Sequence, residues 1–245
     1  MIEVRELYKS FEDKDAIKNI SCLFEEGIIN MVIGSSGSGK TVLLKCIVGL
    51  LRPDKGKIYY DHQDFTAMGY FEMKRLRQKI GMLFQGSALF NSQTVFENIS
   101  FPLVMHTSMS KAEIRKRVEY CLERVNLDKK VADLYPQELS GGMQKRVGIA
   151  RAIANNPKYI FYDEPNSGLD PKTSRVIDAL IKEISHEMKT TTIVNSHDMT
   201  SVFDIADHVY FIYEGQLWWN GKPSEIMHSA NAELIQMINA AGKHE

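Results

Sequence analysis

One loop constrains this chain more than any other feature, because its residue pattern requires a strand before it and a helix after it. Residues 34–41 read GSSGSGKT and match G-x-x-x-x-G-K-[S/T] between an apolar strand pattern and a helical pattern at 42–48. Glycines let main-chain N–H groups turn inward around phosphate oxygens, and the helix N-terminus adds positive potential. The pattern predicts a nucleotide-binding α/β domain, in which Lys40 reaches the terminal phosphates and the Thr41 hydroxyl binds Mg²⁺. The ATP-binding residues predicted from this loop are Gly34, Ser35, Ser36, Gly37, Ser38, Gly39, Lys40, Thr41 and Val42.

A second segment, at 159–164, ends a buried-strand pattern in two adjacent carboxylates. The strand would deliver Asp163 to the edge of a sheet, where its oxygens can hold Mg²⁺. Glu164 would then lie where it can orient or deprotonate an attacking water. An Asp-Glu pair alone is also common as an acidic turn after a strand. The phosphate loop upstream favours the catalytic interpretation.

Composition sets limits on the class of protein. The chain has 245 residues, of which 44% are apolar and 25% charged, with a formal net charge of −1. That balance is typical of one globular unit and lacks the basic footprint of a nucleic-acid binder. The basic run at 74–79 is interpreted as a solvated helix face. No nucleic-acid partner is therefore expected.

The cysteines and the hydrophobic runs indicate where such a chain works. Cys22, Cys46 and Cys121 are odd in number and widely spaced, which favours three reduced cysteines in a reducing cytosol over a zinc site. No signal-peptide pattern is present, and no apolar run approaches the ~18 residues that a membrane helix needs. If this chain works at a membrane, another chain is expected to supply the span.

Short apolar patterns predict the parallel strands of a nucleotide-binding fold, and helical patterns lie between them. A capping box at Ser110 and Glu113 predicts the start of one helix, and a second helix should follow Gly142 and end before the stop signal Asn155-Asn156-Pro157. The predicted strands are 28–33, 80–84, 159–162 and 191–195, with a hairpin at 209–213 and 216–220 and a last helix at 231–241.

Residues 139–144, LSGGMQ, resemble the signature motif of ABC ATPases, which other P-loop proteins lack. The other motifs of that family occur in the family's order. Gln85 resembles the Q-loop glutamine, residues 167–170 (SGLD) the D-loop, and His197 the switch histidine. The resemblance covers about residues 2–225. With the phosphate loop and the Asp163-Glu164 segment these motifs number six, and six in order are specific although each one alone is weak.

The resemblance implies roles for single residues. Phe11 is expected to stack on adenine, with Tyr8 as the competing aromatic. Gln85 is expected to sense Mg²⁺ and the γ-phosphate, and His197 to contact that phosphate. The catalytic residues are then Glu164, His197 and Lys40, and the Mg²⁺ ligands are Thr41, Gln85 and Asp163. Two departures from the family pattern are Tyr162, whose hydroxyl needs a partner, and Asn166, where a small residue or Thr is common.

The implied fold is a P-loop NTPase (RecA-like) ABC ATPase core with an inserted helical subdomain and an N-terminal antiparallel β element. The whole chain, 1–245, is expected to be one ABC ATPase domain. Its expected parts are the RecA-like core at about 1–86 and 157–222, the helical subdomain at about 87–156 and a C-terminal helical tail at 223–245.

In this family two ATPase subunits close head to tail around ATP. The resemblance therefore implies a second copy of the chain as partner. Ser140, Gly141 and Gly142 of that copy would contact the γ-phosphate in trans, with the following helix aiming its N-terminus at the charge. ATP would favour the closed pair, and hydrolysis would release it.

The segment 84–103, FQGSALFNSQTVFENISFPL, resembles the ATPases of Mla-type (MCE-associated) lipid transporters. That likeness implies phospholipid transport between the inner and outer membranes of a bacterium, with the ATPase peripheral on the cytoplasmic side of the inner membrane. The implied partners are an MlaE-type permease and a periplasmic MlaD-type MCE-domain protein. Two alternatives stay open: an importer ATPase for a small solute such as an amino acid, and a soluble ABC ATPase of the Fe–S assembly type.

Overall fold

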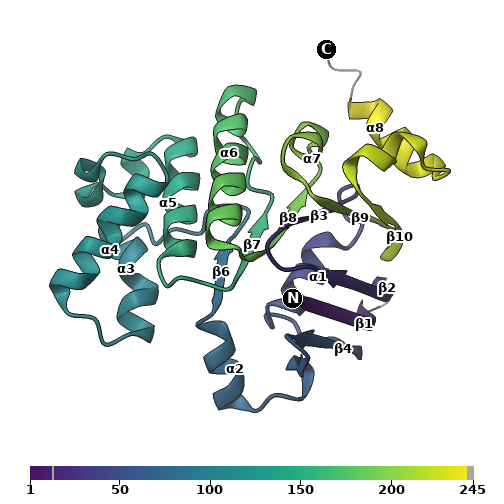
Figure 1. Cartoon of the computed structure of the whole chain (residues 1–245), viewed down its shortest axis with the longest axis horizontal. Helices are drawn as coiled ribbons and strands as arrows, with labels where there is room; N and C mark the ends of the chain where they lie inside the picture. Colours follow the sequence, from purple (N-terminus) through teal and green to yellow (C-terminus); the bar gives the residue numbers. More distant parts are fainter. Residues whose placement is uncertain (13, 242–245) are drawn as a thin grey trace.

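The computed structural model describes residues 1–12 and 14–241, which form two β-sheets and a set of helices around them (Figure 1). The larger sheet has six strands in the order β10-β9-β3-β8-β7-β6, and the smaller has four in the order β2-β1-β4-β5. Non-consecutive neighbours in the larger sheet mean that its strands are joined by crossovers, as in other parallel α/β folds.

The larger sheet is parallel except at one edge, where β10 pairs antiparallel with β9. Every residue of β3, β7 and β8 is buried, including the polar residues of β8, and the mostly apolar patterns of β3 and β7 are typical of such strands. The strands predicted from the sequence are all present, with ends shifted by one residue at most. Their bounds are β3 Ile29–Ile33, β6 Ile80–Leu83, β7 Tyr159–Asp163, β8 Thr191–Ser196, β9 His208–Tyr213 and β10 Gln216–Gly221.

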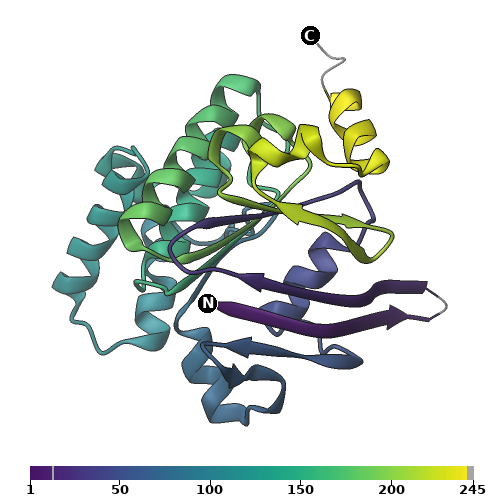
Figure 2. The same cartoon turned by 45° about the vertical axis from the view of Figure 1, so that its right-hand side comes forward.

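The smaller sheet is antiparallel and covers one face of the larger sheet, with α1 (Lys40–Ile47) between the two (Figure 2). Val4 of β1 lies opposite Cys22 of β2 on one side and Ile58 of β4 on the other. Together with Phe161 of β7, these strands and α1 enclose one hydrophobic core. The strand bounds are β1 Ile2–Phe11, β2 Lys14–Phe24, β4 Lys55–Tyr60 and β5 Gln63–Asp64.

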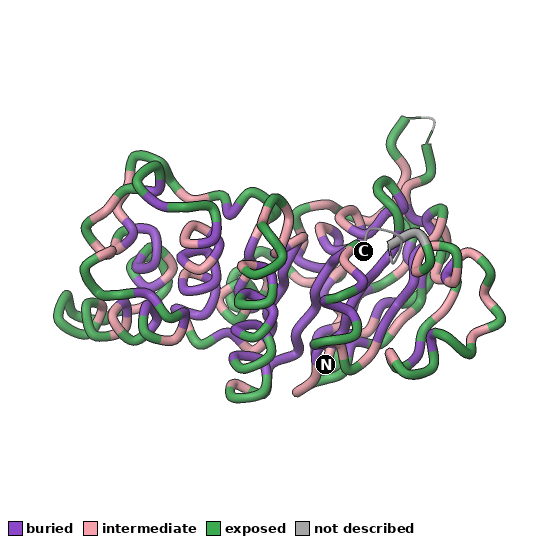
Figure 3. The backbone as a smooth tube through the Cα atoms, turned by 90° about the horizontal axis from the view of Figure 1, so that it is seen from above, coloured by how far each residue is buried: buried purple, intermediate pink, exposed green. Residues whose placement is uncertain are grey.

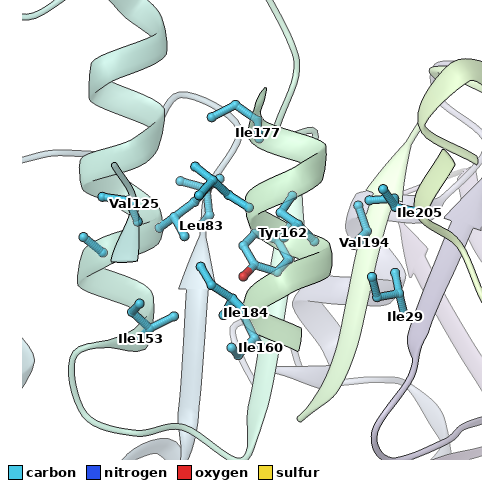
Figure 4. Packing of buried hydrophobic residues seen from close by; sticks show 14 of the residues in the cluster. Ile29, Leu83, Val125, Ile153, Ile160, Tyr162, Ile177, Ile184, Val194 and Ile205 are labelled. Carbon is cyan, nitrogen blue, oxygen red and sulfur yellow. The ribbon is translucent and has the colours of Figure 1, made fainter. Parts of the chain in front are cut away.

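Helices α5 (Gly141–Ile153), α6 (Pro171–Met188) and α7 (Met199–Ile205) cover the opposite face of the larger sheet. Strand alternation explains the division, since Ile160 and Tyr162 face these helices whereas Phe161 faces α1. Figure 4 shows Tyr162 among Leu83, Ile177 and Ile184 in this second core.

Of the helices inserted between β6 and β7, α5 packs on the sheet, and α3 (Val95–His106) and α4 (Lys111–Arg124) pack on α5 to one side of it, as the tube in Figure 3 shows. Ser110 caps α4 in a reciprocal capping box with Glu113, as predicted. Before β6, α2 (Tyr70–Arg77) carries the basic run, whose cations are exposed. Short 3₁₀ turns lie at Phe65–Ala67, Lys129–Asp133, Pro136–Glu138 and Pro223–His228.

The last helix, α8 (Ala232–Ala241), begins one residue later than predicted and packs on its own domain through Leu234, which is fully buried. The predicted C-terminal tail extends to 245, and its residues 242–245 lie outside the described part of the chain. Among the described residues, no helix combines the length and apolarity needed to cross a membrane.

Candidate active site

Four parallel strands end at one edge of the larger sheet, and each delivers a predicted site residue there. β3 leads into the phosphate loop, β6 into Gln85, β7 into Glu164 and β8 into His197. Because neighbouring parallel strands end on the same side, residues from distant parts of the sequence meet at this edge.

The backbone of the phosphate loop is shaped by glycine. Gly34 has φ 154° and Gly39 has φ 110°, and a Cβ at Gly34 would lie 2.2 Å from the carbonyl oxygen of Ile212. The loop is also tied to the hairpin between β9 and β10, because Gly215 N donates to Ser38 O at 3.0 Å. Side chains larger than hydrogen at Gly34 would push the loop away from the sheet.

Lys40 is buried at the base of this loop and folds across it. Its Nζ donates to Gly34 O at 2.7 Å and to Ser35 O at 3.0 Å. Burial lowers the pKa of Lys40, and the nearby carboxylates of Glu164 and Asp163 offset part of that effect. The ammonium therefore lies within the ring of main-chain groups that the loop presents to phosphate oxygens.

The Thr41 hydroxyl and the Asp163 carboxylate lie together, as a Mg²⁺ site requires. Thr41 Oγ1 donates to Asp163 Oδ1 at 3.2 Å, and Asn195 Nδ2 donates to the same oxygen at 3.2 Å. Magnesium prefers oxygen ligands and is bound through one or two protein ligands plus substrate phosphates. The oxygen ligands that these side chains offer fit that ion, and Gln85 lines the same cavity as Thr41, which is described below.

Glu164 and His197 form a direct pair. Glu164 Oε2 and His197 Nδ1 are 2.7 Å apart; the carboxylate side chain is 12% exposed and the imidazole 64%. Glu164 adopts a left-handed conformation with φ 51°, which is uncommon outside glycine. Its backbone N donates to Asn195 O at 3.0 Å, so hydrogen bonds hold the carboxylate at the end of β7.

A cavity of about 770 Å³ brings most of the predicted residues together. Phe11 lines it and Tyr8, the alternative aromatic, does not. Gly34, Ser38 and Asp163 lie outside its lining. The lining residues are Phe11, Lys14, Ala16, Ser35, Ser36, Gly37, Gly39, Lys40, Thr41, Val42, Gln85, Glu164, His197 and Met237.

Four residues at or beside this site were not predicted from the sequence. Lys14, Ala16 and Met237 line the cavity, and Asn195 bonds to Asp163. A polar residue at the end of the apolar strand β8 is a signal that points to Asn195. No such signal points to Met237, because the helical pattern of α8 predicts which face of the helix is apolar but not what that face contacts.

The signature residues lie apart from the phosphate loop of the same chain. None of Ser140, Gly141 and Gly142 lines the cavity. Ser140 and Gly141 are exposed, and the Ser140 hydroxyl accepts from Met143 N at 3.3 Å, capping α5. Gly142 is buried, and a Cβ there would lie 2.6 Å from Thr173 Cγ2. The exposed start of α5 is therefore open to contacts from outside the chain.

The two departures from the family pattern have different outcomes. The Tyr162 hydroxyl is buried and has no hydrogen-bond partner among the described residues. Asn166 instead enters a polar network, since its Nδ2 donates to Asp178 Oδ1 at 2.8 Å and to Ser201 Oγ at 3.0 Å. This network ties the segment after Glu164 to α6 and α7.

Comparison with known proteins identifies relatives of two transport systems. The chain is 39% identical over 238 residues to the intermembrane phospholipid transport system ATP-binding protein MlaF of Haemophilus influenzae, covering 97% of this chain and 90% of that protein. It is 43% identical over 221 residues to the methionine import ATP-binding protein MetN of Desulfitobacterium hafniense. That alignment covers 89% of this chain but 64% of the importer subunit, slightly under two thirds of its length.

Structural comparison agrees. A dimeric ATP-binding cassette in a post-hydrolysis state, bound to ADP and Pi, superposes with a TM-score of 0.84 at 33% identity, covering 91% of this chain and 99% of that chain. This likeness confirms the predicted fold class. A profile of the ABC transporter family matches residues 17–167. The chain therefore belongs to the ABC transporter family, as an ATP-binding subunit that hydrolyses ATP, with Mg²⁺, to drive transport.

Proposed function

We propose that this subunit energises the movement of phospholipid between bacterial membranes, from the cytoplasmic side of the inner membrane. The support is the 39% identity to MlaF over nearly the full length of both chains, together with the resemblance of residues 84–103 to Mla-type ATPases. The partners proposed on this basis are an MlaE-type permease and a periplasmic MlaD-type protein.

The catalytic roles proposed for the site rest on one observation, the hydrogen-bonded pair of Glu164 and His197 beside the phosphate loop. Glu164 acts as the base that orients and deprotonates the attacking water. His197 holds that carboxylate and contacts the γ-phosphate, while Lys40 neutralises charge on the phosphates. Thr41, Asp163 and Gln85 would hold Mg²⁺, which would supply further positive charge to the phosphate oxygens.

We propose that hydrolysis requires a second copy of the chain. The exposed position of Ser140 and Gly141, away from the cavity of their own chain, supports a contact in trans. The structural neighbour with ADP and Pi is dimeric. In the proposed head-to-tail pair, the start of α5 from one copy seals the phosphate loop of the other, and the N-terminus of that helix favours the phosphate charge.

The surface proposed for the permease is a groove beside the helical insert. It encloses about 390 Å³ and lies between the end of α2, β6 and helices α3 and α5. Phe90 and Phe101 stand at its edge with ring centroids 5.0 Å apart, and each ring is about 40% exposed. Since Phe90 follows Gln85 closely in sequence, a helix of the permease seated here would move with the nucleotide site.

A small-solute importer is the second candidate, favoured by the 43% identity to a methionine importer subunit. Isolating the tagged protein from membranes in mild detergent separates the two candidates. Co-purification of a permease with bound phospholipid and a periplasmic MCE-domain protein would support lipid transport. Recovery of an importer permease and a solute-binding protein, without phospholipid, would support the second candidate instead.

A further inference from the structure

Helix α5 holds the loop that follows β6 by its main chain. Arg151, near the end of the helix, donates to Ser87 O at 2.7 Å and to Ala88 O at 2.9 Å. Lys145, in its second turn, donates to Gln85 O at 2.5 Å. Ser87 and Ala88 have φ of 62° and 46°, a region that non-glycine residues rarely adopt. The bonds from α5 therefore hold this loop in an unfavourable backbone conformation.

Lys145 differs from Arg151 because it also bonds to a residue on the catalytic side. Its Nζ also donates to the carbonyl oxygen of Glu164 at 3.3 Å. One ammonium thus bridges Gln85 at the end of β6 and Glu164 at the end of β7. The side chain itself belongs to the helix that the signature residues begin.

The environment of Lys145 is unusual for a lysine that has only a packing role. The residue is 5% exposed, and both of these hydrogen bonds go to main-chain carbonyl oxygens. A buried ammonium is costly unless it is well bonded, so these two carbonyls have to stay in place for the charge to be tolerated.

The carbonyl group that Lys145 contacts belongs to the same residue as the proposed catalytic carboxylate. Glu164 is held in its left-handed conformation by hydrogen bonds on both sides of its Cα, from its own N to Asn195 O and from Ser167 N to its carbonyl at 3.2 Å. Loss of the bond from Lys145 would free the peptide that follows Glu164 to rotate, and we expect such a rotation to move the carboxylate relative to His197. Catalytic geometry tolerates little of such movement, since an error of about 1 Å can cost about a hundredfold in rate.

We propose that Lys145 is a positioning residue, which transmits the position of the signature helix α5 to Gln85 and to Glu164 within the same chain. The inference rests on the proposed role of Glu164 as the catalytic base. When contact with a second copy or a permease moves α5, the Lys145 ammonium moves with the helix. It can keep both of its hydrogen bonds, to Gln85 O and to Glu164 O, in only one position of α5. Contact at the signature end is thereby linked to the orientation of the carboxylate.

The test replaces Lys145 by methionine, an unbranched side chain that is one atom shorter and has no hydrogen-bond donor. Lys116→Met, at an exposed lysine on α4, is the matched control in the same helical insert. We expect Lys145→Met to lower kcat at least about tenfold, while the KM for ATP and the affinity for Mg-ATP stay within about threefold. Lys145→Gln, which retains a shorter donor, should give an intermediate kcat, and Lys116→Met should match the wild type.

Two results would overturn the inference. One is a kcat within twofold of the wild type in both Lys145 variants. The other is a loss of ATP affinity in step with thermal stability in both variants, which is what a purely structural lysine produces. Glu164→Gln is measured alongside. If Glu164→Gln hydrolyses ATP normally, the proposed catalytic base is wrong. If Glu164→Gln is inactive and Lys145→Met is fully active, Glu164 keeps its proposed role and only the role of Lys145 is rejected.

Discussion

The phosphate-loop end and the signature end of this molecule differ in how their polar groups are satisfied. At the phosphate loop, Lys40 bonds to the loop's own carbonyls, Asp163 to Thr41 and Asn195, and Glu164 to His197. At the signature end, Ser140 and Gly141 are exposed, and the serine hydroxyl only caps its own helix. One half of the site is thus organised within the chain, whereas the residues of the other half are exposed at its surface.

The largest effect is expected from Glu164→Gln, which tests the organised half. The amide keeps the size of the side chain but cannot take a proton, so kcat should fall by about 100-fold or more. Binding of Mg-ATP should persist, because the phosphate loop is untouched. Single-turnover hydrolysis and nucleotide titration measure the two effects, with the exposed Glu123→Gln as control. Unchanged turnover would reject the role given to Glu164.

The next largest effect tests whether the two halves come from different copies. Lys40→Ala and Ser140→Arg should each lose most ATPase activity when assayed alone. Mixed one to one, they should recover about a quarter of the wild-type rate, because about half of the pairs are mixed and each mixed pair has one intact site. ATPase assays of mixed and separate variants measure this. No recovery in stable mixed pairs would contradict a site shared in trans.

A smaller effect concerns the strand that delivers the carboxylates. Tyr162 buries a hydroxyl with no described partner, so Tyr162→Phe should raise the free energy of unfolding by about 1 kcal/mol. Tyr159→Phe on the same strand is the matched control. The hydroxyl of Tyr159 donates to Asp61 Oδ2 at 2.7 Å, and its loss should destabilise the fold. Urea unfolding compares the two, and destabilisation by both changes would show that the Tyr162 hydroxyl does have a partner.

The smallest effect lies at the opposite end of β7, remote from both halves of the site. Burial alone raises the pKa of Asp61, but hydrogen bonds from Lys158 and Tyr159 outweigh it and lower that pKa to about 2. Because the folded-state pKa lies below the ordinary value of about 3.9, the stabilisation is present above that pH and is lost as the pH falls through about 2. The carboxylate is 39% exposed, so solvent screening keeps the effect below about 1 kcal/mol.

The measurement for this last prediction is urea unfolding between pH 2 and pH 7 on the wild type and on Asp61→Asn. The variant should show a weaker decrease in stability between about pH 4 and pH 2. Equal pH dependence in the two proteins would mean that Asp61 does not contribute. ATP hydrolysis at neutral pH should stay the same, since Asp61 lies away from the cavity.

Much of the fold was predictable because it depends on local patterns. Strands β3 and β7 are buried on both faces, and a mostly apolar sequence pattern is typical of such strands. Ser110 and Glu113 form the predicted capping box because both partners lie within one turn. The helix after the phosphate loop began at Lys40 and not at 42, because the glycine loop continues directly into its first turn.

The candidate site was predictable to the extent that its residues belong to short motifs. Phe11, Lys40, Thr41, Gln85, Glu164 and His197 all line one cavity. Lys14, Met237 and Lys145 belong to no such motif, and packing of the elements that carry them brings them to the site. Their contributions depend on how β2, α8 and α5 pack, which local periodicity does not encode.

By itself the sequence determined the phosphate loop, the positions of the strands along the chain and the identity of the two carboxylates, because each is set by residues adjacent in the chain. Only the tertiary structure decided that Lys145 bridges Gln85 and Glu164, that the Tyr162 hydroxyl is left without a described partner, and that the signature lies apart from its own phosphate loop. The physical reason is that a hydrogen bond depends on distance and direction in space, and packing sets both between segments that the sequence separates.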